Sequence, residues 1–156
     1  MAVYLIGIFA IFGFVVFSVL HYSKREVQPF NYEPQYNPDL NDNEVELCRL
    51  INQHRINLGL NAVIPEKLAS EVCEDRIYAD IANGRKPSHV GWENRVAQCK
   101  ANLGGEICNA NINTPLGFFM EYLKSKSHRE CIETPYYTHI GISLFEKRNY
   151  CMFTKY

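Results

Sequence analysis

The segment SKSHREC, from Ser125 to Cys131, places a histidine among residues that can act as nucleophiles. His128 lies three residues after Ser125 and three before Cys131. If the segment is helical, residues three apart share a face, whereas the adjacent Ser127 and His128 diverge by about 100°. The spacing therefore allows His128 to pair with Ser125 or with Cys131.

Each of these pairs needs further groups before it can catalyse a reaction. A serine hydrolase requires a carboxylate that orients the histidine and an oxyanion hole, and the segment supplies neither. A thiol enzyme with Cys131 and His128 requires a free, activated thiolate. The serine hydrolase is therefore disfavoured. The thiol enzyme requires Cys131 to be free. In an oxidising compartment, a disulfide at Cys131 is the simpler interpretation.

Six cysteines follow the N-terminal region, and none forms a Cys-x-x-Cys pair, which argues against a zinc ribbon or a thioredoxin-type motif. An even number of cysteines in a small domain indicates an oxidising compartment and disulfide bonds. Among the many pairings, we predict Cys131 with Cys151 and Cys99 with Cys108. The disulfide candidates are Cys48, Cys73, Cys99, Cys108, Cys131 and Cys151.

The composition is that of a folded protein with one main domain. Hydrophobic residues make up 47% and charged residues 21% of the 156 residues, which is typical of globular proteins. The formal net charge is −1, and the sequence has no basic stripe interleaved with aromatic residues. These features argue against nucleic acid as a partner.

The N-terminus differs from the rest of the chain. Residues 2–20 carry no charge and would reach about 28 Å as a helix, close to the ~30 Å hydrocarbon core of a membrane. A cleavable signal peptide is the alternative, but no basic residue precedes the run and no Ala-x-Ala site follows it. We therefore predict a transmembrane anchor or signal-like segment at 1–22, favouring the uncleaved anchor, then a proline-containing linker at 23–42 and one domain at 43–156.

Two features disagree about the side of the membrane on which this domain lies. Lys24 and Arg25 follow the apolar run, and the positive-inside rule would place the domain in the cytoplasm. The six cysteines instead indicate an oxidising compartment. We give the cysteines more weight. We expect a membrane-anchored protein with an extracytoplasmic domain, or a secreted protein if the N-terminus is cleaved.

Apolar periodicity predicts helices packed around a small antiparallel sheet, which is an α+β fold. Asp42 or Asn43 is expected to cap the first helix, and Thr114 to cap the longest. The last two segments alternate apolar and polar residues as a hairpin does, with a turn at 147–149. The predicted helices cover 43–59, 65–84, 93–103 and 114–132, and the predicted strands cover 105–112, 136–147 and 149–156.

Five segments resemble, in order, the motifs of the CAP superfamily. This family comprises the cysteine-rich secretory proteins, antigen 5 and the pathogenesis-related 1 proteins, and its domain is also called the SCP domain. The similar segments are LINQHRINLGLNAV for the opening helix, SHVGWENR for the loop with the first histidine, GGEICNA for the Gly-Glu-Asn strand, YLKSKSHRECI for the Trp-x-x-Ser-x-x-His-Arg helix, and YTHIGIS for the Thr-His-x-Gly strand. The resemblance covers residues 43–156, is closest to the short bacterial or viral form, and implies a three-layer α-β-α sandwich.

The resemblance also implies a cleft formed by His89, His128 and Glu106. Ser125 stands where many eukaryotic members carry a glutamate, and Tyr122 stands where the family has a tryptophan. In some members the cleft holds a divalent metal, and two neutral imidazoles with a carboxylate suit zinc. The same residues also suit a hydrogen-bonded polar cleft that binds no metal.

Three functions are open from the sequence. The first is a non-enzymatic module that binds a lipid, a metal or a partner protein through the cleft, with the membrane contacted through the N-terminal helix. The second is a weak metal-dependent hydrolase in which His89, His128 and Glu106 hold a metal-bound water. The third is the thiol enzyme with Cys131 and His128. The uncharged Ser125 removes an acid or base group, so we favour the binding module.

Overall fold

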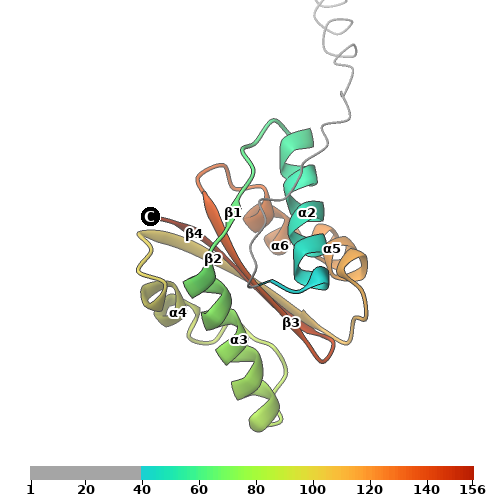
Figure 1. Ribbon diagram of the computed structural model, residues 1–156, viewed down its shortest axis with the longest axis vertical. Coiled ribbons are helices and arrows are strands. Elements are labelled where there is room, and N and C mark those ends of the chain that lie inside the picture. The colour runs from blue at the N-terminus through green and yellow to red at the C-terminus, as the bar shows by residue number, and fades with distance from the viewer. Residues whose placement is uncertain (1–39) are drawn as a thin grey trace, which may run out of the picture. The chain divides into compact units, whose positions relative to one another are not determined.

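The computed structural model describes residues 40–156, which hold five helices and four strands (Figure 1). The predicted anchor at 1–22 and nearly all of the predicted linker lie outside the described residues. From residue 40 to residue 156, no helix is both long and apolar enough to cross a membrane. With the labels of Figure 1, the elements are α2 (Asp42–Asn57), β1 (Ile64–Pro65), α3 (Lys67–Ala82), α4 (Trp92–Gln98), β2 (Leu103–Ala110), α5 (Pro115–Lys124), α6 (Lys126–Ile132), β3 (His139–Phe145) and β4 (Arg148–Lys155).

The four strands form one sheet in the order β1-β3-β4-β2. The central strand β4 pairs antiparallel with β3 on one side and with β2 on the other. β1 consists of Ile64 and Pro65 and pairs parallel with the start of β3. The sheet is thus antiparallel as predicted, apart from β1, which is too short to show a strand pattern in the sequence. β2 forms one edge of the sheet.

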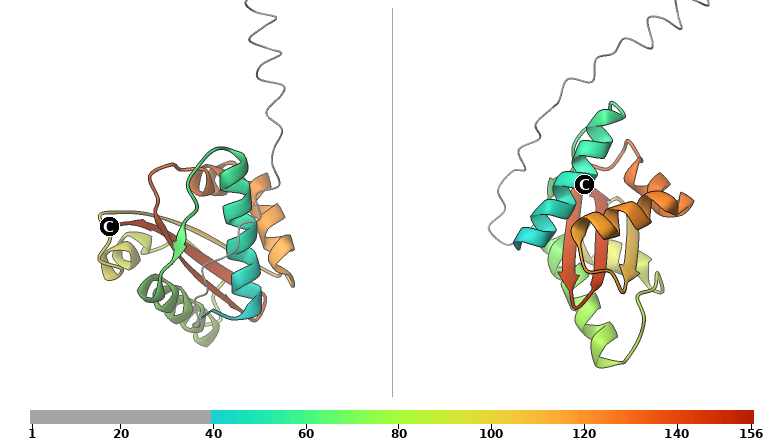
Figure 2. Two further views of the ribbon diagram at one scale, coloured as in Figure 1. Left: turned by 45° about the horizontal axis from the view of Figure 1, so that its top comes forward. Right: turned by 90° about the vertical axis from the view of Figure 1, so that its right-hand side faces the viewer.

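Helices cover both faces of the sheet, so the domain is a three-layer α-β-α sandwich (Figure 2). Successive residues of β4 point to opposite faces. Cys151 and Phe153 pack with α2, α5 and α6, whereas Tyr150 and Met152 pack with α3. Because both faces of β4 are covered, all residues from 149 to 154 are buried, and the strict alternation expected of the hairpin gives way to a continuous buried run.

Close contact between α3 and β3 fixes one of these layers. A Cβ atom on Gly141 would lie 2.2 Å from the backbone carbonyl carbon of Ala69, so only glycine fits there. Ser70 Oγ accepts a hydrogen bond from Ile142 N at 3.1 Å, and Glu44 Oε1 accepts one from Leu144 N at 2.9 Å. These side chains satisfy N–H groups of β3 beyond the short partner strand β1.

Helix boundaries agree with the predicted ones to within a few residues, and the differences have local causes. Asn41, not Asp42 or Asn43, caps α2. Asn41 Oδ1 accepts hydrogen bonds from Asn43 N and Glu44 N, and Glu44 Oε2 accepts one from Asn41 N. Thr114 caps α5 as predicted, at 3.0 Å from Gly117 N. The predicted helix at 65–84 begins at residue 67 because residues 64 and 65 form β1, and the predicted helix at 93–103 ends at residue 98.

The predicted long helix at 114–132 is wrong, because the chain breaks into α5 and α6 at Ser125. The backbone of Ser125 is extended, with φ −81° and ψ 120°, and this residue is the N-cap of α6. Serine favours caps over helix interiors because its hydroxyl competes for backbone hydrogen bonds. The hairpin turn also shifts, to Glu146 and Lys147, whose φ values of 45° and 62° are those of a two-residue type I′ turn.

The predicted disulfides are absent, since all six cysteines, each within the described residues, are free and no two are at disulfide distance. The predicted partners Cys131 and Cys151 do lie on the same face of the sheet, as do Cys99 and Cys108. Five of the six side chains are buried, where a cysteine packs as a small hydrophobic residue. Burial of these side chains in the two clusters accounts for their packing role in this structure.

Arg55 connects α2 to the loop that follows it, to the end of α6 and to the segment between α6 and β3. Its side chain is 0% exposed, and its hydrogen bonds go to backbone carbonyls. Nε donates to Asn61 O at 2.9 Å, Nη1 donates to Ile132 O at 2.5 Å and Thr134 O at 2.9 Å, and Nη2 donates to Tyr137 O at 3.4 Å. Burial lowers the pKa of this guanidinium. One cation thus holds the ends of α2 and α6 together.

We predict that Arg55→Lys lowers the free energy of unfolding by about 3 kcal/mol, because lysine cannot bond all four carbonyls and leaves buried acceptors unsatisfied. Urea denaturation followed by circular dichroism measures this loss. Arg49→Lys on the same helix is the matched control. Arg49 pairs with Glu46 at 39% and 43% side-chain exposure, so its loss costs less than about 1 kcal/mol. Equal urea midpoints for the two variants would contradict the role of Arg55.

Candidate functional site

A cleft of about 350 Å³ opens beside the edge strand β2. Its walls come from the loop before α4 and from α4 on one side, from α6 on the other, and from β2 between them. Gly105 lets Tyr137 and Cys131 pack against β2, since a Cβ atom there would lie 2.4 Å from Tyr137 Oη and 2.9 Å from Cys131 Sγ. The cleft is lined by His89, Trp92, Gly104, Gly105, Glu106, Ser127, His128, Cys131 and Tyr137.

Glu106 is held in a buried ion pair with Arg95 at the base of this cleft. Arg95 Nε lies 2.6 Å from Glu106 Oε2 and Nη2 lies 2.7 Å from Oε1, which is a bidentate contact. Only 1% of the Glu106 side chain and 9% of the Arg95 side chain are exposed. Burial lowers the pKa of Arg95, but the bonds to Glu106 outweigh it and the net pKa is raised. The two side chains therefore form a bidentate pair that is shielded from solvent.

The loop that carries His89 is fixed on both sides of that residue. Before it, Ser88 N donates to Tyr150 Oη at 2.8 Å, and this hydroxyl donates to Asp80 Oδ2 at 2.8 Å. After it, Val90 O accepts from Arg95 Nη1 at 3.0 Å. The imidazole Nδ1 itself lies 3.2 Å from Glu106 Oε1. These contacts hold the loop in place, while 47% of the His89 side chain remains exposed to solvent.

His128 meets His89 from the opposite wall of the cleft. The two ring centroids are 5.8 Å apart with an interplanar angle of 64°. Tyr122, from α5, packs edge-on against His128 at 5.3 Å. The His128 Nδ1 atom is buried and has no hydrogen-bond partner among residues 40–156. Burial, and then the nearby His89, lower the pKa of His128 below the ordinary value of 6.5, which favours the neutral ring.

Neither a family model nor a curated protein matches the sequence, but solved structures do. An extracellular protein containing an SCP domain from Bacillus anthracis has a TM-score of 0.68 at 20% identity, over 80% of this chain and 45% of that protein. A cysteine-rich secretory protein from Staphylococcus aureus has a TM-score of 0.67 at 13% identity, over 81% and 42%. An outer surface protein from Borrelia burgdorferi has a TM-score of 0.64 at 18% identity, over 70% and 90%.

The described domain has the SCP fold. The predicted fold class and the predicted resemblance to the CAP superfamily are thereby confirmed at the level of the fold. At these identities the likeness carries the fold alone, and the chain spans less than half the length of the first two proteins.

Ser125 does not line the SCP cleft, although the sequence placed it there. It sits at the break between α5 and α6, and its hydroxyl lies 3.3 Å from that of Ser127, which does line the cleft. Cys131 lines the cleft too, but burial raises the pKa of its thiol to about 12. A protonated thiol is a weak nucleophile, which disfavours a thiol enzyme with Cys131 and His128.

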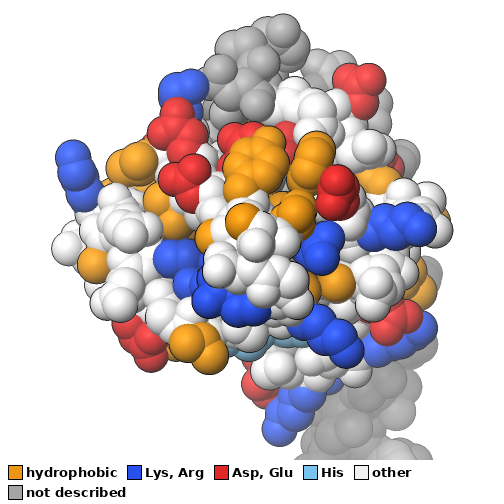
Figure 3. Space-filling model, turned by 90° about the horizontal axis from the view of Figure 1, so that it is seen from below, with side chains coloured by type: hydrophobic (Ala, Val, Ile, Leu, Met, Phe, Trp, Pro, Cys, Tyr) orange, Lys and Arg blue, Asp and Glu red, His pale blue; other side chains and the backbone are white. Residues whose placement is uncertain are grey.

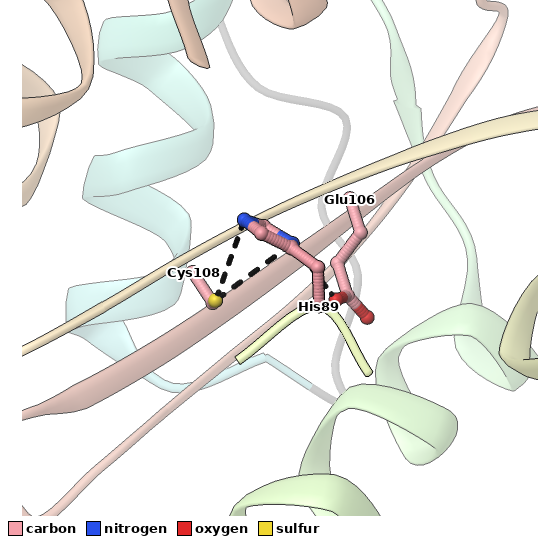
Figure 4. A group of neighbouring side chains, drawn as sticks. All are labelled: His89, Glu106 and Cys108. Atoms are coloured by element: carbon pink, nitrogen blue, oxygen red, sulfur yellow. Dashed lines mark hydrogen bonds and ion pairs between the residues drawn. The ribbon is translucent and has the colours of Figure 1, made fainter. Parts of the chain in front are cut away.

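Cys108 is the residue of the site that the sequence reading missed. Its Sγ lies 3.9 Å from both ring nitrogens of His89 (Figure 4). Ligand atoms of His89, Glu106 and Cys108 all lie within 4.8 Å of one another, so these three form a possible metal-binding group. The strand alternation could have found Cys108, since it lies two residues after Glu106 on β2 and shares its face, but the sequence assigned it to a disulfide.

A larger cavity of about 440 Å³ lies between the start of α2, α3 and the end of β3, and it suits a ligand less well. Its carboxylates are already engaged: Glu44 accepts from Leu144 N, and Glu74 accepts from the Tyr78 hydroxyl at 2.8 Å. Viewed from below, the domain shows hydrophobic side chains gathered beside acidic ones (Figure 3). The half-exposed rings of Tyr78 and Phe145 belong to this cavity and stack edge-on at 5.4 Å.

We predict a pKa below 6.5 for His128 in an NMR titration of the metal-free protein, because burial disfavours the charged ring. His89→Gln removes only the electrostatic effect of His89, which is the smaller of the two causes. This variant should therefore raise the pKa of His128 part of the way toward 6.5. The unfolded chain takes up the proton more readily than the folded one, so this group's contribution to stability is complete above pH 6.5 and is lost as the pH falls below it. A His128 pKa at or above 6.5 contradicts the assigned environment.

Proposed function

We propose that this protein is a non-enzymatic binding module whose cleft takes a divalent metal through His89 and His128. The observation that carries the proposal is that Glu106 is already paired with Arg95. Its carboxylate is buried and bound at both oxygens by Arg95, whereas the two imidazoles face each other across the cleft. Neutral imidazoles are good zinc ligands, and the lowered pKa of His128 keeps that ring neutral near pH 7.

The alternative hydrolase has less support from the same contacts. A metal-dependent hydrolase needs a group that takes a proton from the attacking water. Glu106 is the only carboxylate that lines the cleft among the described residues, and Arg95 offsets its charge in a bidentate pair. Ser125, at the family's second carboxylate position, carries no charge and lies outside the cleft. The cleft therefore has ligands but lacks a free base.

The size of the cleft also bears on its ligand. Pockets for small molecules measure about 300–1,000 Å³, and this cleft of about 350 Å³ lies at the lower end. Such a volume takes a hydrated metal ion, or a metal together with one small group of a lipid or partner protein, more readily than a whole lipid. Trp92 and Tyr137 supply the apolar wall for such a group.

An extracytoplasmic location is part of this proposal. The three similar structures are described as an extracellular protein, a secretory protein and an outer surface protein. The apolar segment at 2–20 and the linker after it suit display of the domain at a membrane. The six cysteine thiols are free, so disulfide bonds give this location no support. Buried thiols are also protected from oxidation, so free cysteines are compatible with it.

Isothermal titration of the full-length protein with Zn²⁺ tests the proposal. His89→Ala and His128→Ala should each weaken zinc binding at least about 10-fold, since even outer-shell partners of a metal contribute that much. His54→Ala is the control, because His54 pairs with Glu133 at 2.9 Å and does not line the cleft. Zinc affinity that is unchanged in both cleft variants contradicts the proposal. Ester hydrolysis by the zinc-loaded protein that is lost in Glu106→Gln would favour the hydrolase.

A further inference from the structure

We infer that Cys108, which lies beside the cleft next to His89, is a third ligand of the metal and makes the site selective for soft metal ions such as zinc and copper(I). This inference rests on the proposed function, because it adds a donor to the two histidines. It also changes the role of Glu106, which the sequence resemblance had offered as a ligand. In this arrangement Glu106 orients His89, and the sulfur of Cys108 takes the place of the carboxylate at the metal.

The contact between Glu106 and His89 selects the ring nitrogen that faces a metal. His89 Nδ1 lies 3.2 Å from Glu106 Oε1. A neutral imidazole that donates its Nδ1 hydrogen to a carboxylate keeps its lone pair on Nε2, and this carboxylate–histidine arrangement is common behind metal sites. Arg95 holds the carboxylate in place with two short bonds. The pair Arg95–Glu106 therefore presets His89 for coordination through Nε2.

The position of Cys108 fits a shared ion. With bonds of about 2.3 Å to sulfur and 2.0–2.1 Å to nitrogen, a tetrahedral zinc ion holds those two ligand atoms about 3.6 Å apart. Cys108 Sγ and His89 Nε2 are 3.9 Å apart. Sγ is equally far from Nδ1. The Glu106 contact therefore selects Nε2 as the ligand atom, and binding still requires a small rotation of the half-exposed imidazole toward the ion.

His128 completes the donor set from the opposite wall. Its ring centroid lies 5.8 Å from that of His89. Two imidazoles bound to one tetrahedral zinc ion at about 2.0–2.1 Å have centroids about 5.2 Å apart, so the two rings must move slightly closer to share an ion. Its Nδ1 is buried without a hydrogen-bond partner among residues 40–156. Buried polar atoms nearly always have a hydrogen-bond partner, so this nitrogen is an exception among the described residues.

Two imidazoles and one thiolate favour zinc and copper(I) over magnesium and calcium, which prefer oxygen ligands. Burial raises the pKa of the Cys108 thiol to about 12, so this thiol is protonated in the metal-free protein. On binding, the S–H bond of Cys108 breaks as the sulfur–metal bond forms, and the proton passes to solvent. No oxidation is involved. The buried position of Cys108, 8% exposed, keeps the thiol from other reactions until a metal enters through the cleft.

Titration of the reduced full-length protein with Co²⁺ tests this inference, because a cobalt–thiolate bond produces a charge-transfer absorption in the near ultraviolet that imidazole ligands do not produce. We expect this absorption in the native protein and in Cys131→Ser, and its loss in Cys108→Ser and Cys108→Ala. Cys131 is the matched control because its thiol lines the cleft, whereas Cys108 lies beside it, next to the His89 ring. Circular dichroism of each variant shows that it is folded, and the native protein gives an answer even if the variants do not fold.

The possible outcomes separate this inference from the proposed function. Cobalt that binds through the histidines without the charge-transfer absorption overturns the role of Cys108 and leaves the two-histidine metal site in place. An absorption lost in Cys131→Ser and kept in Cys108→Ser overturns the assignment of the thiol. If neither Co²⁺ nor Zn²⁺ binds, the proposed metal site fails as well. Competition supports the inference further if Zn²⁺ displaces Co²⁺ while a large excess of Mg²⁺ does not.

Discussion

Glu106 carries a charge in a place where only 1% of its side chain is exposed, and Arg95 is the cation that offsets it. This buried ion pair organises the cleft, because each partner has a second task. Arg95 also donates to Val90 O, next to His89, and Glu106 also contacts the His89 ring. Removing either partner would leave a buried charge without compensation, which typically costs about 3–5 kcal/mol. The loop that carries His89 depends on this pair for its position.

The rest of the scaffold brings the two histidines to opposite sides of one strand edge. β2 lies at the edge of the sheet, so α4 and its preceding loop approach from one face while α6 approaches from the other. Tyr150 and Asp80 hold Ser88 in place, and Arg55 binds the carbonyl groups that follow α6. The cleft is therefore a product of both helical layers, and neither layer forms it alone.

The sequence contained the parts of this structure that depend on local patterns and on family motifs. The α+β class, the cap at Thr114 and the segments that bear His89, Glu106 and His128 could all be predicted from it. The break at Ser125 could not, because the helical apolar pattern continues on both sides of it. Disulfide pairing failed for a different reason: it depends on distances between thiols, and cysteines that pack as small core residues have the same sequence signature.

A crystal structure of the protein grown with zinc, with the ion located by its anomalous scattering, tests the central claim that the imidazoles bind metal while Glu106 stays paired with Arg95. The account predicts an ion about 2.0–2.1 Å from a nitrogen of both His89 and His128 and about 2.3 Å from Cys108 Sγ. The Arg95–Glu106 contact would be unchanged. An ion bound by Glu106 with Arg95 displaced, or no ion at the two histidines, would contradict it.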